Sequence, residues 1–251
     1  NYLTDRSCRL VDWNDMQSVL ISSLQSIMKT VNILCSDCCW VLCTPTTGSF
    51  TQKKRERKFL VELQKALEAC HIPFKNEYVE DKEIKEPRVS CMIPDGLGKY
   101  WSGPFVSVRS FGNKEDSQTV VCCSLFGSFE RMTASILERF RGNLPLSIAP
   151  EQVRLVSMPS QSVHTKMAFE RLSHEGFRVG VDRADRRLAE KVHSAEKEKV
   201  PYIAVIGEVE AKKNMLTLRK NERNNKQRNV TINDLLDELH QENSEMSPFA
   251  F

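Results

Sequence analysis

The apolar pattern of the first half of the chain predicts three helices and three strands. In the predicted helices, apolar side chains recur every three or four positions, which is the period of one helix face. The predicted strands are short apolar or β-branched runs with turn residues nearby. The predicted helices lie at 12–30, 52–69 and 129–140, and the predicted strands lie at 40–44, 105–108 and 119–126.

The second half alternates between strand and helix patterns. Strands are predicted at 153–158, 177–182, 201–207 and 215–219, and helices at 163–176, at 185–199 and from Thr231 onward. Thr231 can cap the last helix, because Asp234 follows three positions later. Strands that alternate with helices predict a βαβ arrangement with a largely parallel sheet, here mixed because of a closing hairpin. The stretch from Pro145 to Pro150 predicts a linker, with domains at 1–146 and 147–251.

Composition narrows the class of protein without naming a function. The chain has 251 residues, is 40% hydrophobic and 27% charged, and carries a net charge of +3. These values predict a globular protein of one large or two ordinary domains. No apolar run reaches the roughly 18 residues of a membrane span, so no membrane partner is expected. The first residue is Asn, which we interpret as a processed form or a fragment.

Nine cysteines without secretory features predict a reducing, cytoplasmic location with free thiols or metal ligands. Cys35 and Cys38 have a spacing that zinc accepts, and Cys39 follows directly. Since no second pair lies near them in the sequence, buried thiols are the favoured interpretation. The histidines form no spaced cluster, and no Ser-His-Asp arrangement or phosphate loop is present.

A basic segment at 211–230 indicates binding of nucleic acid. It holds seven Lys or Arg residues against Glu222 alone, together with several amide side chains. Clustered cations neutralise phosphates, and amides and Arg can pair with exposed base edges of RNA. A solvated hairpin is the alternative. A second basic run, at 53–58, could touch a phosphate backbone, although a solvated helix face is the favoured interpretation there.

Several short segments of the sequence together resemble the motifs of a known family. They are Leu125 to Met132, Arg141 to Leu146, Ala149 to Val153, Gly176 to Asp182 and Lys199 to Gly207. The first resembles the third signature motif of class II aminoacyl-tRNA synthetases. The others resemble the anticodon-binding domain of the threonyl type. The resemblance implies an α/β protein in which part of an antiparallel catalytic sheet precedes a mixed-sheet anticodon-binding domain.

In the catalytic part, the resemblance implies sites for ATP and zinc. Arg131 stands where the family pairs an Arg with nucleotide phosphates, so it is the implied catalytic residue. Gly127 and Ser128 would let the backbone approach the nucleotide, and Glu130 would hold the helix start. Cys8 and Cys122 stand where the family has zinc-binding His residues, and thiolates also bind zinc.

The same part departs from the family pattern. Arg6 stands where the family has an acidic residue near the substrate amine, and Ser102 replaces a Tyr. The segment between Pro104 and Cys122 is much shorter than in the family. It lacks a motif containing Cys-Gly-Thr that, in the family, lines the pocket for ATP and the amino acid. The second motif is expected upstream of residue 1.

In the C-terminal part, the resemblance implies contacts with a threonine-accepting tRNA. The candidate residues are Lys199, Glu210, Arg219, Lys220 and Arg223. The leading hypothesis is a tRNA-binding protein of this family whose ligase activity needs upstream residues. The alternatives are a working threonine–tRNA ligase with an all-cysteine zinc site and a non-catalytic adaptor. The resemblance also implies a homodimer.

Overall fold

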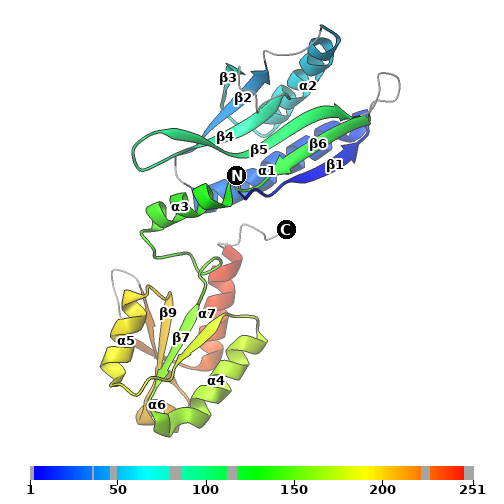
Figure 1. Cartoon of the computed structure of the whole chain (residues 1–251). Helices are drawn as coiled ribbons and strands as arrows, with labels where there is room; N and C mark the ends of the chain where they lie inside the picture. Colours follow the sequence, from blue (N-terminus) through cyan, green and yellow to red (C-terminus); the bar gives the residue numbers. More distant parts are fainter. Residues whose placement is uncertain are drawn as a thin grey trace. The chain divides into compact units, whose positions relative to one another are not determined.

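The computed structural model of the protein describes residues 3–35, 37–45, 50–79, 86–111, 118–221 and 227–245. The chain divides into two compact units, unit 1 over Asn1–Arg139 and unit 2 over Phe140–Phe251. The division lies a few residues before the boundary that Pro145 and Pro150 predict. Each unit contains one mixed sheet (Figure 1).

Unit 1 holds a six-stranded sheet in the order β1-β6-β5-β4-β2-β3. All neighbours are antiparallel except β2 and β3, which are parallel. Its elements are β1 (Ser7–Val11), α1 (Met16–Leu34), β2 (Cys39–Pro45), α2 (Phe50–Ala69), β3 (Phe74–Val79), β4 (Arg88–Pro94), β5 (Tyr100–Phe111), β6 (Gln118–Ser124) and α3 (Phe129–Phe140). A short 3-10 turn, η1 (Trp13–Asp15), leads into α1.

The helices cover one face of this sheet. Val106 and Val108 of β5 are fully buried, as are Leu20 and Leu24 of α1, and α1 packs against β5 and β6. Alternation along the strands places other side chains on the opposite face. Among them are Arg88, Ser107 and Cys122, whose register joins β4, β5 and β6. This opposite face therefore carries polar groups where these three strands adjoin.

Unit 2 holds a five-stranded sheet in the order β11-β10-β9-β7-β8. Strands β7, β8 and β9 are parallel, and β10 and β11 add an antiparallel hairpin. Its elements are β7 (Val153–Ser157), η2 (Pro159–Gln161), α4 (Ser162–His174), β8 (Val179–Asp182), α5 (Leu188–Lys197), β9 (Tyr202–Ile206), α6 (Glu208–Lys213), β10 (Leu216–Lys220), β11 (Arg228–Val230) and α7 (Ile232–Glu245). The predicted α/β class, with a closing hairpin, is confirmed.

Two layers of helices sandwich the unit 2 sheet. Leu155, Ala204 and Leu218 pack with α4 and α7 in the larger core. Val156 and Ile203 point the other way and pack with Val192 and Ala195 of α5 in a smaller core. The cap at α7 forms as predicted. Asp234 N donates to Thr231 Oγ1 at 3.2 Å, and Thr231 N donates to Asp234 Oδ2 at 2.9 Å.

Three strands of unit 1 were missed by the apolar pattern, for a physical reason. β1 and β3 are edge strands with mostly exposed side chains, so they bury little apolar surface. β4 is buried on both faces and lacks the alternation that marks a half-buried strand. In the described part of the chain, no helix has the length and apolar character needed to cross a bilayer.

Candidate nucleic-acid interface

One face of the β10–β11 hairpin is polar because of strand alternation. Leu216 and Leu218 enter the larger core, so Thr217 and Arg219 point to the side that α5 occupies. Thr217 lies opposite Asn229 of β11, and its hydroxyl is 2.9 Å from Asn229 Oδ1. The α5 side of the hairpin therefore presents hydroxyl, amide and guanidinium groups.

Glu210 joins this face from the short helix α6. Its Oε2 accepts from Gly207 N at 3.1 Å, and its Oε1 accepts from the Thr217 hydroxyl at 2.9 Å. These bonds fix the carboxylate beside β10. The pKa of Glu210 is lowered, because backbone N–H groups and the Thr217 hydroxyl stabilise the charged form. Glu210 and Arg219 therefore lie on one side of the hairpin.

Arg219 is held by two side chains. Its Nη1 donates to Glu196 Oε1 of α5 at 3.1 Å. Gln227, with its amide oxygen turned toward the guanidinium, accepts from Arg219 Nε at 2.6 Å and also from Nη2. The side chain keeps 28% of its surface exposed. The guanidinium is thus oriented in advance and still reachable from solvent.

Lys220 lies on the opposite face of the same strand. Its Nζ forms an ion pair with Glu242 Oε2 of α7 at 2.9 Å and lies 5.5 Å from the ring centre of Tyr202. The Tyr202 hydroxyl donates to Glu242 at 2.6 Å, and burial raises the pKa of that hydroxyl. Arg228 is paired with Glu238 of α7 on the same side. Two cations of the basic segment are therefore neutralised by α7.

The remaining candidates lie elsewhere. Lys199 follows α5 with a positive φ of 59°, and its Nζ donates to the carbonyl of Arg141. It does not join the Glu210–Arg219 face through any bond of the described residues. Arg223 lies outside the described residues.

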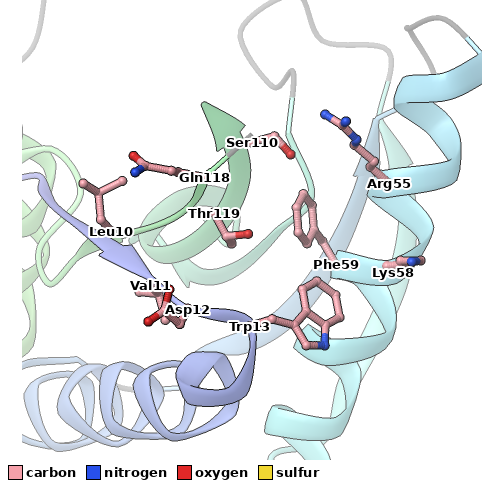
Figure 2. Close-up of a pocket in the computed structure, with 10 residues that line it drawn as sticks. All are labelled: Leu10, Val11, Asp12, Trp13, Arg55, Lys58, Phe59, Ser110, Gln118 and Thr119. Atoms are coloured by element: carbon pink, nitrogen blue, oxygen red, sulfur yellow. The ribbon is translucent and has the colours of Figure 1, made fainter. Parts of the chain in front are cut away.

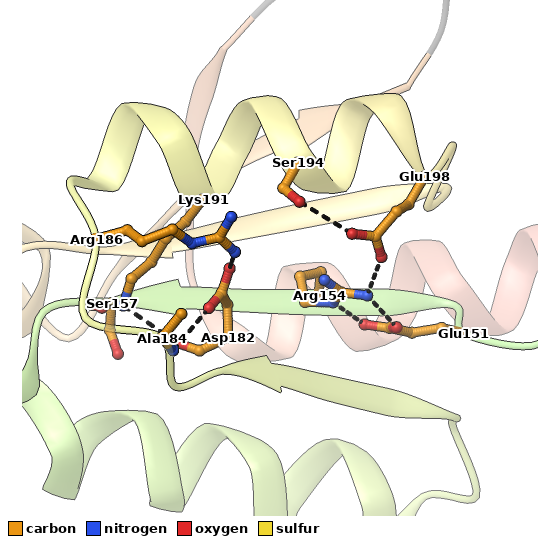
Figure 3. A network of polar contacts seen from close by, with 9 residues as sticks. All are labelled: Glu151, Arg154, Ser157, Asp182, Ala184, Arg186, Lys191, Ser194 and Glu198. Atoms are coloured by element: carbon orange, nitrogen blue, oxygen red, sulfur yellow. Dashed lines mark hydrogen bonds and ion pairs between the residues drawn. The ribbon is translucent and has the colours of Figure 1, made fainter.

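A polar network that the sequence did not reveal fixes α5 to the sheet (Figure 3). Arg154 Nη2 donates to Glu151 Oε2 at 2.6 Å and to Glu198 Oε2 at 2.8 Å. Arg154 also lowers the pKa of Glu198. Lys191, which is 1% exposed, donates to the carbonyls of Ser157 at 2.8 Å and Asp182 at 3.2 Å. Because Glu196 lies on this anchored helix, the network also positions Arg219.

In unit 1, the predicted motif forms a tight turn after β6. Gly127 has a φ of +69°, and a Cβ there would lie 2.7 Å from the backbone of Gly103, so only Gly fits. Asp5 accepts from Leu125 N at 2.6 Å and Phe126 N at 3.0 Å. The carboxylate of Asp5, whose role the sequence did not indicate, therefore shapes the turn.

The start of α3 follows this turn. The Ser128 hydroxyl accepts from Arg131 N at 3.3 Å and donates to Glu130 Oε2 at 2.9 Å. Glu130 Oε1 accepts from Leu3 N at 3.0 Å, and these bonds lower the pKa of Glu130. Arg131 is exposed in the first helical turn. The structure thus brings Gly127, Ser128, Glu130 and Arg131 together at one helix N-terminus.

Cys8 and Cys122 are direct neighbours across β1 and β6. Burial, with the thiol of Cys8 beside it, raises the pKa of Cys122 to about 11. In the described part of the chain, no three His, Cys, Asp or Glu side chains converge as metal ligands. Two thiols with Arg6 nearby do not fit zinc by themselves, since a structural site needs about four ligands.

A second thiol group forms where α1 meets β2. Cys91 of β4 lies opposite Trp40, and Cys38 precedes Trp40 by two residues, so both thiols share one face. A hydrogen bond from the Cys91 thiol lowers the pKa of Cys38 to about 7, whereas burial raises the pKa of Cys35 to about 11. No local sequence pattern indicates Cys91, because its approach to Cys38 depends on the pairing of β2 with β4.

Comparisons with known proteins found a matching domain family and several relatives. Residues 152–242 match the family model described as an anticodon binding domain. The threonine–tRNA ligase of Methanosphaera stadtmanae is 32% identical over 178 residues, which are 63% of this chain and 29% of that protein. The threonine–tRNA ligase of Thermotoga neapolitana is 28% identical over 194 residues, which are 72% of this chain and 30% of that protein. The chain therefore spans less than a third of these curated relatives.

A solved structure shows the same fold. It is described as the RNA binding domain of threonyl-tRNA synthetase from Cryptosporidium parvum, and it superposes with a TM-score of 0.81 at 20% identity. The superposition covers 96% of this chain and 64% of that chain. Residues 152–242 therefore match an anticodon binding domain, and the chain is similar to part of the threonine–tRNA ligases.

Proposed function

We propose that the protein binds tRNA, and specifically a threonine-accepting tRNA, through the α5-facing side of the β10–β11 hairpin. The observation that carries the proposal is the joint placement of Glu210 and Arg219 on one polar face. Glu210 presents an ionised acceptor, and Arg219 presents a planar fork of donors. The family match over residues 152–242 supports the assignment of this face to anticodon bases.

The chemistry of the face suits an unpaired base. A guanidinium donates two parallel hydrogen bonds to a base edge, and a carboxylate accepts from an exocyclic amine or ring N–H. Glu196 and Gln227 hold the Arg219 fork before RNA arrives, so less side-chain entropy is lost on binding. Positive charge from Lys212 and Lys213 at the end of α6 would add phosphate attraction.

The test compares two neighbouring cations on β10. Arg219→Ala is expected to weaken tRNA binding by roughly 5- to 150-fold, the loss of about 1–3 kcal/mol for one specific base contact. Lys220→Ala removes the same charge from the opposite face, so a smaller loss is expected. Binding of threonine-accepting tRNA is measured by fluorescence anisotropy at two salt concentrations.

A tRNA with a changed anticodon serves as the specificity control. The wild-type chain should discriminate against it, and the Arg219→Ala variant should lose that discrimination. Equal losses for the two variants, with discrimination unchanged, would refute the assignment to this face.

The ligase activity of the longer relatives remains a prediction for this protein. The turn at Gly127 and the exposed Arg131 favour contact with an ATP phosphate, as the family resemblance implies. One Arg does not hold a triphosphate, so ATP binding would need further cations. A homodimer and a cytoplasmic location are likewise predictions, and zinc binding would need ligands beyond Cys8 and Cys122.

A further inference from the structure

A pocket of about 600 Å³ opens in unit 1, at the opposite end of β6 from Gly127 (Figure 2). Its floor is formed by Val11, Ser110 and Thr119, which are neighbours across β1, β6 and β5. Strand alternation places these three side chains on the helix-covered face of the sheet. The floor of the pocket therefore lies on the other side of the sheet from Cys8, Cys122 and Arg88.

An aromatic wall stands on one side of the pocket. Trp13, in the turn before α1, keeps 49% of its surface exposed. Its ring centre is 6.2 Å from that of Phe59 of α2, with 33° between the ring planes, and Phe59 is only 5% exposed. The buried ring holds the indole in place. The indole thus offers a flat surface that is oriented before any ligand arrives.

Basic side chains complete the lining. Arg55 and Lys58 of α2 both line the pocket, and Asp12 is the single acidic residue among its lining residues. Figure 2 shows the Arg55 side chain extending from α2 on the side where Ser110 lies. Gln118, Ser110 and Thr119 add amide and hydroxyl groups. The pocket therefore combines an aromatic surface, net positive charge and neutral polar groups.

We propose that this pocket binds a nucleotide unit, with the base on the indole of Trp13 and the phosphate near Arg55 and Lys58. Stacking on an aromatic side chain accepts any base, because every base has a π face, and nearby cations take up the phosphate. The amide and hydroxyl groups reach base edges or ribose hydroxyls. The volume is within the usual range for small-ligand sites.

An acidic peptide fits the pocket less well. Its carboxylates would pair with Arg55 and Lys58, but it would leave the half-exposed indole without a flat partner. The proposed occupant is therefore a nucleotide, either free or within a single RNA strand. The proposal rests on unit 1 alone and does not depend on anticodon recognition by unit 2.

Tryptophan emission of the whole chain provides the test. Wild-type protein is titrated with AMP, with a short mixed-sequence single-stranded RNA and with polyglutamate. RNA is expected to quench emission in a saturable way, and Trp13→Phe, which keeps a ring against Phe59, should abolish that quenching. Quenching by AMP as well would identify a free nucleotide as sufficient, whereas quenching by RNA alone would identify a strand.

The charge arm uses two matched double variants of α2. Arg55→Ala with Lys58→Ala should weaken RNA binding at least fivefold. Lys54→Ala with Arg57→Ala removes the same charge from exposed positions of the same helix that do not line the pocket, and should change affinity less than twofold. Far-UV circular dichroism confirms folding, and Lys58→Ala alone is the milder variant if Arg55 is needed for stability.

Three results would overturn the proposal. They are no quenching by either nucleotide ligand, equal weakening by the two double variants, and quenching by polyglutamate as strong as that by RNA. Arg219→Ala is expected to leave the Trp13 signal unchanged. A failure of anticodon binding in unit 2 is thereby distinguishable from a failure of this pocket.

Discussion

At the scale of single residues, the role of each cation depends on the side chains that pair with it. Arg219 and Lys220 are neighbours in sequence and equal in charge. Arg219 meets Glu196 and Gln227 beside a polar face, while Lys220 meets Glu242 above the Tyr202 ring. Counting charges along 211–230 treats both alike. Glu196 orients Arg219, which is the candidate for contact with a base, whereas Glu242 holds Lys220 in a structural ion pair.

The thiols of unit 1 give a prediction at the same scale. Alkylation of Cys38 by iodoacetamide should rise steeply through pH 7, because a hydrogen bond from Cys91 lowers the Cys38 pKa to about 7 and the thiolate is the reactive form. Cys35 and Cys123, whose pKa values burial raises to about 11, should stay slow below pH 9. Mass spectrometry of peptides after timed labelling measures each site.

Removing the donor supplies the control for this prediction. Cys91→Ser keeps a hydroxyl donor and should shift the Cys38 profile little, whereas Cys91→Ala should move its midpoint upward toward an ordinary thiol. Identical pH profiles for Cys38 in all three proteins would show that Cys91 does not stabilise the thiolate.

At the scale of elements, α5 connects the interior of unit 2 to its candidate RNA face. Lys191 and Arg154 tie the helix to the strand ends, and Glu196 on the same helix orients Arg219. Helices of this length depend on tertiary packing for most of their stability. A disturbance of the anchor is therefore expected to reach the RNA face.

Lys191→Met tests the anchor. It leaves the carbonyls of Ser157 and Asp182 without their buried donor, which is expected to lower the free energy of unfolding by about 1–3 kcal/mol. Lys197→Met, on an exposed position of the same helix, should stay within about 0.5 kcal/mol of wild type. Urea unfolding followed by circular dichroism gives both values, and equal effects would mean that Lys191 does not anchor the helix.

At the scale of the whole molecule, the two units have separate cores. Leu155 is fully buried in the larger core of unit 2, and its partners all belong to unit 2. Leu155→Ala is expected to destabilise unit 2 by about 2–5 kcal/mol through the lost contacts and the cavity left behind. Native-state hydrogen exchange should show weaker protection in β7, β9 and α7.

The same experiment contains its own control. Protection of β4, β5 and α1 in unit 1 should be unchanged, because the two core clusters around the unit 2 sheet are made of unit 2 residues. A parallel loss of protection in both units would show that the chain unfolds as one cooperative body.

The alternation of strands and helices after residue 150, and the helix cap at Thr231, could be predicted because both depend on nearby residues. The half-buried strands of unit 2 place apolar residues such as Leu155 and Leu218 where their period requires. The edge strands β1 and β3 could not be predicted, since exposed strands carry little apolar signal. Cys91, Asp5 and Glu196 act across large sequence separations, which no local pattern encodes.

The sequence by itself indicated the resemblance of its second half to an anticodon-binding domain, the mixed α/β class, and the residues that can carry charge or bind bases. It could do so because motif spacing, helix caps and apolar periods are local properties. Only the tertiary structure decided which of those residues work together. Strand alternation places Arg219 and Lys220 on opposite faces of β10. The packing of α5 and α7 then determines that Arg219 pairs with Glu196 and Lys220 with Glu242. Likewise, only the folding of α2 onto η1 brings Phe59 against Trp13 beside Arg55.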